Sequence, residues 1–572
     1  MSTLKNGNPW DFLDEYKNTH FSGEWPTLPE MFNITVERFP KNKCFTTFDP
    51  NYVSFTYEEA LDRIQKTAAV LVEHGVKPGD RVAVTGKNSP EWAIAYMGIL
   101  YAGGVVVPLD YQLHKKEVEN LMEFSDAKVL FIDEEKYDSV ETGGIEQISL
   151  SPQKPNYILE LQPSKQAAGG FSSCSEDDLA AIMYTSGTTG KPKGVMLTHK
   201  NLVSDCYLAQ GELSISNEDV FYALLPIHHS YTMLAVFIEG MSVGAEIVFA
   251  KRLVIKQILA DFKQGQVTMF LGVPMLFNKL IKGIMQGIRK KGILVYGLMR
   301  FLMGVSGLIK KLFHVNIGKK LFGKVLEQVS LEHNRICISG GGPLPSSTFR
   351  RFNQLGIDFV QGYGLTETSP IVALNPVEHY KEDSVGRMIA GTDTAIDSPD
   401  ERGRGEILLK GPMIMQGYYK NEEATKEAFT KDGFFKTGDM GYLDKENYLY
   451  LTGRKKSMIV KAGGKNVYPE EIEDHFQLYE EVEQILVRGY IVDEKERSED
   501  IEALVYPNLE YFKANGAPTE DEWKEIKKRI NTVVAEVNKE LLPYQRIQRV
   551  EVLREPMEMT TTKKIKRHKV ET

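Results

Sequence analysis

The first part of the chain alternates helical and extended patterns of apolar residues. Between residues 57 and 75, apolar positions recur at helical spacing at 61, 64, 68 and 71. Thr56 and Glu59 form a possible capping box at the start of this helix, and Gly75 ends it. Three apolar runs, at 81–85, 105–108 and 128–132, predict short buried strands. This alternation predicts an α/β fold whose large N-terminal part is built in layers around parallel-containing sheets.

The pattern changes after a polar break at 453–456. A short strand is expected at 457–461, followed by a glycine-rich turn and a helix opening at Pro469-Glu470. Further strands are expected at 484–492 and 502–506, and a helix from about Pro518 carries one apolar stripe. We therefore expect residues 457–572 to form a small α+β domain after an N-terminal domain that ends near 453.

A basic, apolar insertion interrupts the N-terminal part at about 279–326. Residues 279–324 contain eleven Lys or Arg and no Asp or Glu, and 292–309 is almost wholly apolar. A basic amphipathic helix is typical of an element that lies on a membrane surface, so peripheral membrane contact through about 284–326 is one interpretation. A helical hairpin packed on the domain, with solvated lysines, is the other. The run is short for a membrane-spanning helix, and Arg300 interrupts it.

Composition narrows the class of partner. The chain has 572 residues, too many for one core, and a net charge of −9, which argues against a nucleic-acid binder. Its four cysteines are widely scattered, so neither a disulfide framework nor a zinc site is indicated. The first twenty residues show no apolar signal region, and a cytoplasmic setting is expected, with peripheral contact at the inner face of a membrane as an option. The oligomeric state, a homodimer included, is open.

The segment Tyr184 to Gly194 reads YTSGTTGKPKG. It joins two apolar segments and combines three glycines with hydroxyl side chains and two lysines, which is typical of a loop that cradles phosphate. It is not a Walker loop, because Gly187 and Gly190 are too close together and Lys191 precedes Pro192. The alternative interpretation is a flexible surface linker without a ligand.

Three further motifs carry candidate chemistry. Ser339 to Leu344 reads SGGGPL and allows a flat ligand to approach the backbone, although a plain turn is equally compatible. Gln361 to Thr368 reads QGYGLTET and offers an aromatic face, a hydroxyl donor and a carboxylate suited to Mg²⁺. Asp439 follows a glycine turn, where its carboxylate can accept from two ribose hydroxyls. A basic tail, TTTKKIKR, begins at Thr560.

With these motifs in this order, residues 30–568 resemble the adenylate-forming superfamily of acyl-CoA synthetases, luciferases and peptide-synthetase adenylation domains. The insertion before SGGGPL and the stretches 405–419 and 461–469 resemble a long-chain fatty acid–CoA ligase in particular. The resemblance implies that ATP, a fatty acid and coenzyme A are the substrates and that Mg²⁺ accompanies ATP. It implies activation of the acid to acyl-AMP, followed by transfer to coenzyme A.

The resemblance also implies residue roles. The β- and γ-phosphates of ATP would be held by Thr185, Ser186, Gly187, Thr188, Thr189, Gly190 and Lys193. Adenine would be held by Gly341, Gly342, Gln361 and Tyr363. Thr366 would contact the α-phosphate, Glu367 would bind Mg²⁺, and Asp439 with Arg454 would hold the ribose. His229 would lie beside the substrate carboxylate. A metal pair of His228 and His229 is the rival interpretation there.

Two C-terminal features complete the implied machinery. The family's catalytic lysine falls on Lys564, but the usual glycine before it is Lys563, so Lys563 could share the role. The family hinge falls on Lys456, within a 454–456 hinge segment, and rotation about it would bring Gly463 and Gly464 to the site for the coenzyme A step. The rival functions are an acyl-AMP ligase that uses an acyl carrier protein, a ligase for medium-chain, aryl or amino acids, and a nucleotide-binding scaffold without catalysis.

Overall fold

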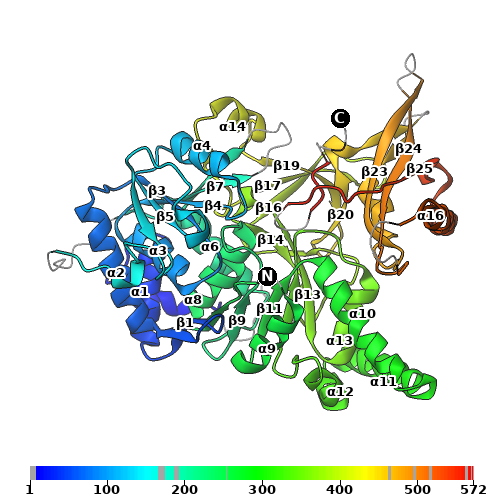
Figure 1. The fold of residues 1–572 in the computed structure, drawn as a ribbon, viewed down its shortest axis with the longest axis horizontal. Coiled ribbons are helices and arrows are strands. Elements are labelled where there is room, and N and C mark those ends of the chain that lie inside the picture. Colours follow the sequence, from blue (N-terminus) through cyan, green and yellow to red (C-terminus); the bar gives the residue numbers. More distant parts are fainter. Residues whose placement is uncertain are drawn as a thin grey trace.

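The computed structural model describes residues 8–164, 174–185, 192–252, 254–461, 465–493, 498–513, 518–560, 564–567 and 570. Within these ranges the strands form three sheets (Figure 1). The α/β class with parallel-containing sheets in a large N-terminal part, expected from the alternating pattern, is confirmed.

The largest sheet has thirteen strands among the described residues and holds most of the site. The neighbouring strands between β1 and β13 pair in parallel, and β2 pairs antiparallel with β1 at the edge. On the other side of β13, all the strands pair antiparallel. In spatial order the strands are β16 (Asp393–Asp397), β17 (Gly405–Lys410), β19 (Phe435–Leu443), β20 (Tyr448–Arg454), β15 (Gly386–Met388), β14 (Ile371–Leu374), β13 (Asp358–Gly364), β12 (Ile336–Ser339), β11 (Met269–Gly272), β9 (Val220–Ala223), β10 (Glu246–Phe249), β1 (Lys43–Thr47) and β2 (Val53–Thr56).

The second sheet carries the ends of the phosphate-loop candidate. It contains the three strands expected in the first part of the chain, and β7 pairs antiparallel with β8. Its spatial order is β18 (Gly417–Tyr418), β8 (Lys193–Thr198), β7 (Leu179–Thr185), β4 (Val105–Leu109), β3 (Arg81–Thr85), β5 (Val129–Ile132) and β6 (Glu146–Ser149).

Helices cover these two sheets. The predicted capping box is present at Thr56 and Glu59, and the helix it opens buries Ile64, Ala68 and Leu71. The helices of the larger part are α1 (Leu28–Arg38), α2 (Tyr57–Glu73), α3 (Pro90–Tyr101), α4 (Lys115–Ser125), α5 (Glu134–Tyr137), α6 (His199–Gln210), α7 (Ser230–Thr232), the π-helix η3 (Met233–Ile238), α8 (Glu239–Val243), α9 (Ile255–Gly265), α10 (Pro274–Lys290), α11 (Ile293–Phe313), α12 (Gly318–Glu327), α13 (Ser346–Leu355) and α14 (Glu422–Ala428).

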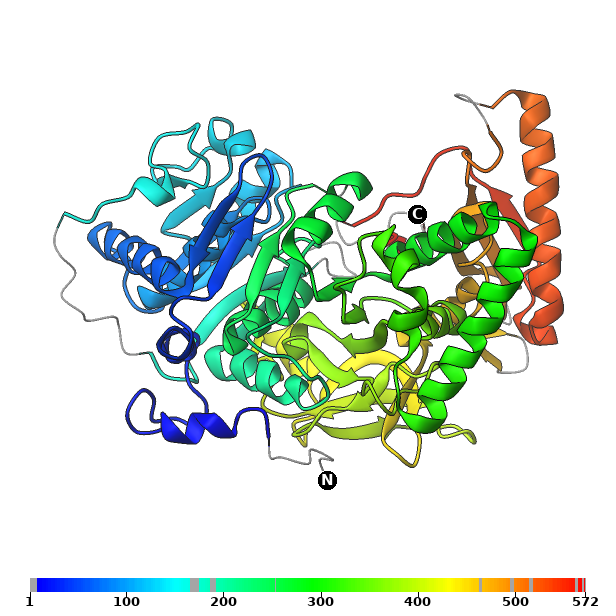
Figure 2. The ribbon, with the colours of Figure 1, turned by 90° about the horizontal axis from the view of Figure 1, so that it is seen from below.

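The C-terminal elements pack around a core of their own, drawn from residues 459–547. The helix expected from Pro518 buries Trp523, Ile526 and Ile530 against the third sheet, as its apolar stripe requires. Figures 1 and 2 both show these elements at the end of the molecule away from α1 and α2. They are α15 (Pro469–Asp474), α16 (Glu520–Glu540), β21 (Ile459–Lys461), β22 (Lys465–Val467), β23 (Val482–Asp493), β24 (Ser498–Pro507) and β25 (Arg549–Val552).

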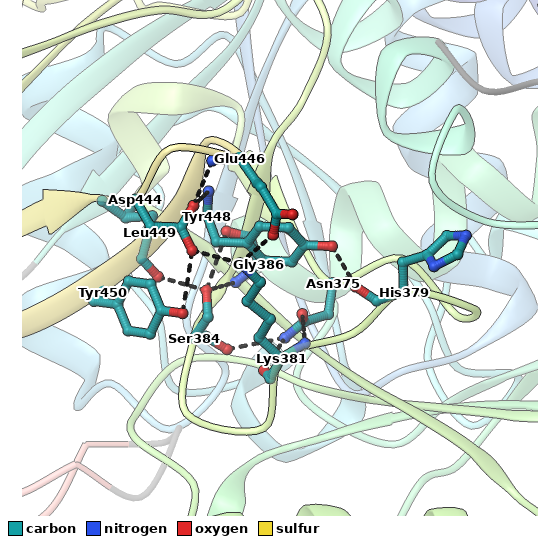
Figure 3. A network of polar contacts seen from close by, with 10 residues as sticks. All are labelled: Asn375, His379, Lys381, Ser384, Gly386, Asp444, Glu446, Tyr448, Leu449 and Tyr450. Carbon is teal, nitrogen blue, oxygen red and sulfur yellow. Dashed lines mark hydrogen bonds and ion pairs between the residues drawn. The ribbon is translucent and has the colours of Figure 1, made fainter. Parts of the chain in front are cut away.

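The hairpin of β19 and β20, which carries Asp439 and Arg454, is fastened by a polar network (Figure 3). Lys381, from the connection between β14 and β15, places its Nζ 2.6 Å from Asp444 Oδ2 in the hairpin turn. Ser384 Oγ donates to the carbonyl oxygen of Leu449 at 2.7 Å. Because these contacts join two separate segments, they hold the hairpin at a fixed place on the sheet.

Candidate active site

The candidate residues that the structure describes meet at one large cavity. It has a volume of about 2630 Å³ and lies where the two large sheets and the C-terminal elements come together. Its lining includes Thr185, Lys193, His229, Gly341, Gly342, Gln361, Tyr363, Thr366, Glu367, Asp439, Arg454 and Lys564. Ser186, Gly187, Thr188, Thr189 and Gly190 lie outside the described residues, as do Gly463, Gly464 and Lys563.

The two ends of the phosphate-loop candidate adjoin the carboxylate proposed for the metal. Thr185 ends β7 and Lys193 begins β8, and Lys193 Nζ lies 4.7 Å from the centroid of the Tyr418 ring. Tyr418 donates its hydroxyl to Glu367 Oε1 at 2.9 Å. Glu367 therefore lies beside the strands from which the loop departs, with one carboxylate oxygen oriented by a tyrosine.

The glycine cluster and Gln361 follow adjacent parallel strands. Ser339 of β12 pairs with Gln361 of β13, so the glycines come directly after β12 and beside β13. In open α/β sheets, the carboxyl ends of parallel strands are where ligands bind. Gly341 has a φ of +78°, and a Cβ placed there would lie 3.9 Å from Lys564 Cε. The backbone at Gly341 is thus open to a flat ligand on the side that Lys564 approaches.

Asp439 is buried between two donors. Tyr363 donates its hydroxyl to Asp439 Oδ2 at 2.7 Å, and Arg454 Nε lies 3.3 Å from Asp439 Oδ1. The pairing of β19 with β20 places Asp439 opposite Arg454. Burial and the neighbouring Asp439 carboxylate raise the pKa of Tyr363 well above its usual value, so Tyr363 keeps its proton and remains a donor. A ribose bound here would share the Asp439 carboxylate with Tyr363.

A hydroxyl pair and a neutral histidine line the centre of the cavity. Thr366 Oγ1 lies 3.1 Å from Ser230 Oγ, and Ser230 follows His229 at the start of α7. Burial, together with the charges of His228 and Lys564, lowers the pKa of His229 to about 3. His229 is therefore neutral at physiological pH. His228 lines the same cavity, with Nε2 3.6 Å from Asp110 Oδ1.

Lys564 reaches this centre from the C-terminal end of the chain. Thr560 donates its amide N–H to the Lys564 carbonyl oxygen at 2.7 Å. Lys564 is exposed to the open volume of the cavity, but the cavity walls lie close around its side chain. This partial burial, reinforced by the charge of Arg454, lowers the pKa of Lys564 to about 8.

The residues at the cavity fit a magnesium ion that arrives with a nucleotide. Glu367 supplies one carboxylate on the wall nearest the phosphate-loop ends, and a nucleotide-bound Mg²⁺ needs only one or two protein carboxylates. The rival metal pair of His228 and His229 finds no support, because the described residues contain no group of three or more His, Cys, Asp or Glu able to hold a metal ion.

Two orienting contacts were not predicted from the sequence: Ser230 beside Thr366, and Tyr418 beside Glu367. Tyr418 belongs to the 405–419 stretch that supports the family resemblance, but nothing in that stretch signals its partner. These contacts join segments that are 136 and 51 residues apart, and such pairings are fixed only by the tertiary fold.

Several known proteins are similar in sequence to this chain. A long-chain-fatty-acid–CoA ligase from Bacillus subtilis is 29% identical over 557 residues, covering 88% of this chain and 89% of that protein. A feruloyl-CoA synthase from Amycolatopsis is also 29% identical, over 82% of this chain and 85% of its own length.

A solved structure of o-succinylbenzoate coenzyme A synthetase from Bacillus subtilis, in complex with ATP and magnesium ion, shares the fold. Its TM-score is 0.73 at 22% identity, covering 95% of this chain and 99% of that one. The family model described as AMP-binding enzyme matches residues 32–419, more than half of the chain. The chain therefore belongs to the AMP-binding enzyme family, within the adenylate-forming superfamily whose motifs it carries.

Proposed function

We propose that this protein is a long-chain fatty acid–CoA ligase, which uses ATP with Mg²⁺ to activate the acid and then passes the acyl group to coenzyme A. One observation supports this proposal most strongly: one cavity, beside the ends of the glycine-rich loop, is lined by Lys564, Thr366, Glu367 and the Asp439–Arg454 pair. The Bacillus subtilis relative supports the long-chain substrate and the coenzyme A acceptor by its name.

In the first step, the carboxylate oxygen of the acid attacks the α-phosphorus of ATP and pyrophosphate leaves. Two anions must approach each other, so neutralising charge is the main task of the site. The carboxylate is ionised at neutral pH and needs no base. Lys564 and Thr366 would contact the α-phosphate, while His229, which is uncharged, adds no second cation beside Lys564.

The phosphate-loop residues, with Lys193, would hold the leaving pyrophosphate, and Asp439 with Arg454 would fix the ribose. Glu367 would hold Mg²⁺, which when bound neutralises phosphate charge. This arrangement leaves the protein a positioning and electrostatic role, without a covalent enzyme intermediate.

In the second step, the coenzyme A thiolate attacks the acyl carbonyl carbon and AMP leaves. Lys564 must withdraw for this step, because its side chain extends into the cavity beside Gly341 and occupies space near the acyl-AMP. We propose that the boundary between the domains lies at 454–456, that the C-terminal domain turns about Lys456, and that Gly463 and Gly464 then face the pantetheine arm. The structure places Lys456 in a short helical turn, η5 (Lys455–Ser457), directly after β20.

A second candidate function is a CoA ligase for an aryl acid. The feruloyl-CoA synthase from Amycolatopsis is as identical to this chain as the long-chain ligase is, which is the observation that favours it. A carrier-protein acceptor is the other rival, and it shares the first step. Pyrophosphate exchange into ATP, measured with fatty acids of increasing length and with ferulate, distinguishes a fatty acid substrate from an aryl acid substrate. Formation of acyl-CoA on adding free coenzyme A distinguishes coenzyme A from a carrier protein as the acyl acceptor.

The expected result is exchange that rises with chain length and acyl-CoA formation with free coenzyme A. Exchange with ferulate but none with a fatty acid of sixteen or eighteen carbons would overturn the long-chain assignment. Exchange without acyl-CoA formation would favour a carrier-protein acceptor.

Replacing Tyr418 with Phe should raise the Mg²⁺ concentration needed for half-maximal exchange by about tenfold. The substitution removes the hydroxyl that orients Glu367, and loss of such an orienting bond typically weakens a metal site by 10- to 100-fold. Tyr419→Phe is the matched control, because the Tyr419 hydroxyl donates to Asp126 instead. Equal Mg²⁺ requirements for the two variants would show that Glu367 does not hold the ion.

A further inference from the structure

Helix α11 presents a continuous apolar stripe to solvent. It lies at the rim of the molecule, at the lower right of Figure 1. The stripe recurs at alternating spacings of four and three residues: Leu294, Leu298, Phe301, Val305, Leu308 and Leu312. Three of these side chains are far more exposed than core positions allow, at 86% for Leu294, 68% for Phe301 and 58% for Leu308. Apolar surface gathered in this way marks a contact site.

The opposite face of α11 is fixed to the protein. Met303, Ser306 and Lys310 are buried against the domain. Lys310 Nζ lies 2.6 Å from Asp358 Oδ1 and 2.6 Å from Asn353 Oδ1. Because a buried ion pair fixes the rotation of the helix about its axis, the stripe is held facing outward.

This attachment also decides how α11 would meet a lipid bilayer. It is the one helix in the described part of the chain that is long and apolar enough to cross a membrane, with only 17% of its apolar window buried. Crossing would pull Lys310 away from Asp358 and place Arg300 at mid-membrane, which is costly. A helix lying in the interface keeps both the ion pair and the exposed stripe.

Positive charge surrounds the stripe. Arg289 and Lys290 are exposed at the end of α10, Lys291 is exposed between α10 and α11, and α11 itself exposes Arg300 and Lys311. Residues 279–324 hold no acidic side chain, although the whole chain carries a net charge of −9. An anionic surface would therefore be attracted at this face, while the net negative charge of the whole chain opposes binding in other orientations.

We propose that α11 docks on an anionic lipid bilayer, lying in the plane of the interface with the stripe from Leu294 to Leu312 in the acyl region. The lysines and arginines around it then reach the lipid phosphates. The catalytic cavity is also lined by Met285 and Arg289 of α10 and by Tyr296 of α11. Docking thus brings one end of that cavity close to the bilayer, where acids with long chains partition.

The test is co-sedimentation of the full-length protein with phosphatidylcholine vesicles that contain or lack 30% phosphatidylglycerol. The double variant Phe301→Asp, Leu308→Asp should lose at least tenfold in binding to the anionic vesicles. The matched control is Ile255→Asp, Leu542→Asp, which charges two other exposed apolar positions, at 60% and 47% exposure. Both variants alter exposed side chains only, and circular dichroism with acid-dependent pyrophosphate exchange verifies their folding.

A second pair of measurements separates charge from apolar contact. Lys290→Gln, Lys311→Gln should remove most of the preference for anionic over zwitterionic vesicles, and salt should do the same for the wild type. Sedimentation velocity without lipid tests the other occupant, a second copy of the chain. Equal vesicle binding by the Phe301–Leu308 variant and its control would overturn the proposal. So would a wild-type dimer that this variant dissociates, with no binding to either vesicle.

Discussion

Lys564→Ala is expected to slow acyl-AMP formation by 10²- to 10³-fold, because removing one charge stabiliser at a developing anion costs about that much. The same variant should form the thioester from supplied acyl-AMP at close to the wild-type rate, since the proposed rotation withdraws Lys564 before that step. The two half-reactions are measured separately, by pyrophosphate exchange and by coenzyme A consumption. Lys566→Ala is the matched control, because Lys566 lies on the same segment and pairs with Glu558. Equal loss in both half-reactions would contradict the assignment.

The pKa of Lys564 adds a pH dependence to this prediction. With a pKa of about 8, the amine loses its charge as pH rises through 8, so kcat/KM for ATP in the exchange reaction should fall there. Bound triphosphate favours the charged amine, and the corresponding fall in kcat should therefore occur at higher pH. Lys564→Arg should be slower but flat over this range, because arginine stays charged. A wild-type profile that is flat to pH 9.5 would show that this charge is not required.

Glu239→Gln is expected to change how the stability of the protein depends on pH. Glu239 is 1% exposed at the start of α8, and neither carboxylate oxygen has a hydrogen-bond partner among the described residues. Burial raises its pKa from 4.5 to about 8, so the folded protein holds a proton there that the unfolded chain releases. Stability contributed by this proton is present below pH 4.5 and is lost as pH rises toward 8.

The free energy of unfolding of the wild type should therefore fall, relative to that of Glu239→Gln, by up to about 1.4 kcal/mol per pH unit between pH 5 and 8. Urea unfolding at half-unit steps of pH measures it. Any constant offset from the buried amide leaves this slope unchanged, and buried carboxyls that do not interact with Glu239, such as Asp261, cancel in the comparison. Glu378→Gln, at an exposed position, is the control. Parallel curves for wild type and Glu239→Gln would show that Glu239 is ionised or solvated in the folded protein.

Local patterns in the sequence predicted the local structure well. The capping box at Thr56, the strands of the second sheet and the stripe of α16 depend on spacing within one element, which the chain carries explicitly. The family motifs likewise indicated which residues would meet, and the described ones line one cavity. Their functional roles remain predictions.

What the sequence could not provide depends on contacts between distant segments. The composition of the α11 faces was readable, but not that the apolar face points outward, because this follows from the Lys310–Asp358 pair. The burial of Glu239 was also not predicted. A single acid within an apolar helix ordinarily lies at the surface, and only the packing of neighbouring elements determines otherwise.

Transfer of an oxygen isotope shows whether a carboxylate of the acid attacks the α-phosphorus of ATP. Palmitate labelled with ¹⁸O in both carboxylate oxygens is incubated with ATP, Mg²⁺, coenzyme A and the protein, and the nucleotide product is examined by mass spectrometry. The expected product is AMP that carries one ¹⁸O atom, because the bridging oxygen of the acyl-AMP leaves with the phosphate. Unlabelled AMP, or ADP with the label in inorganic phosphate, would contradict it.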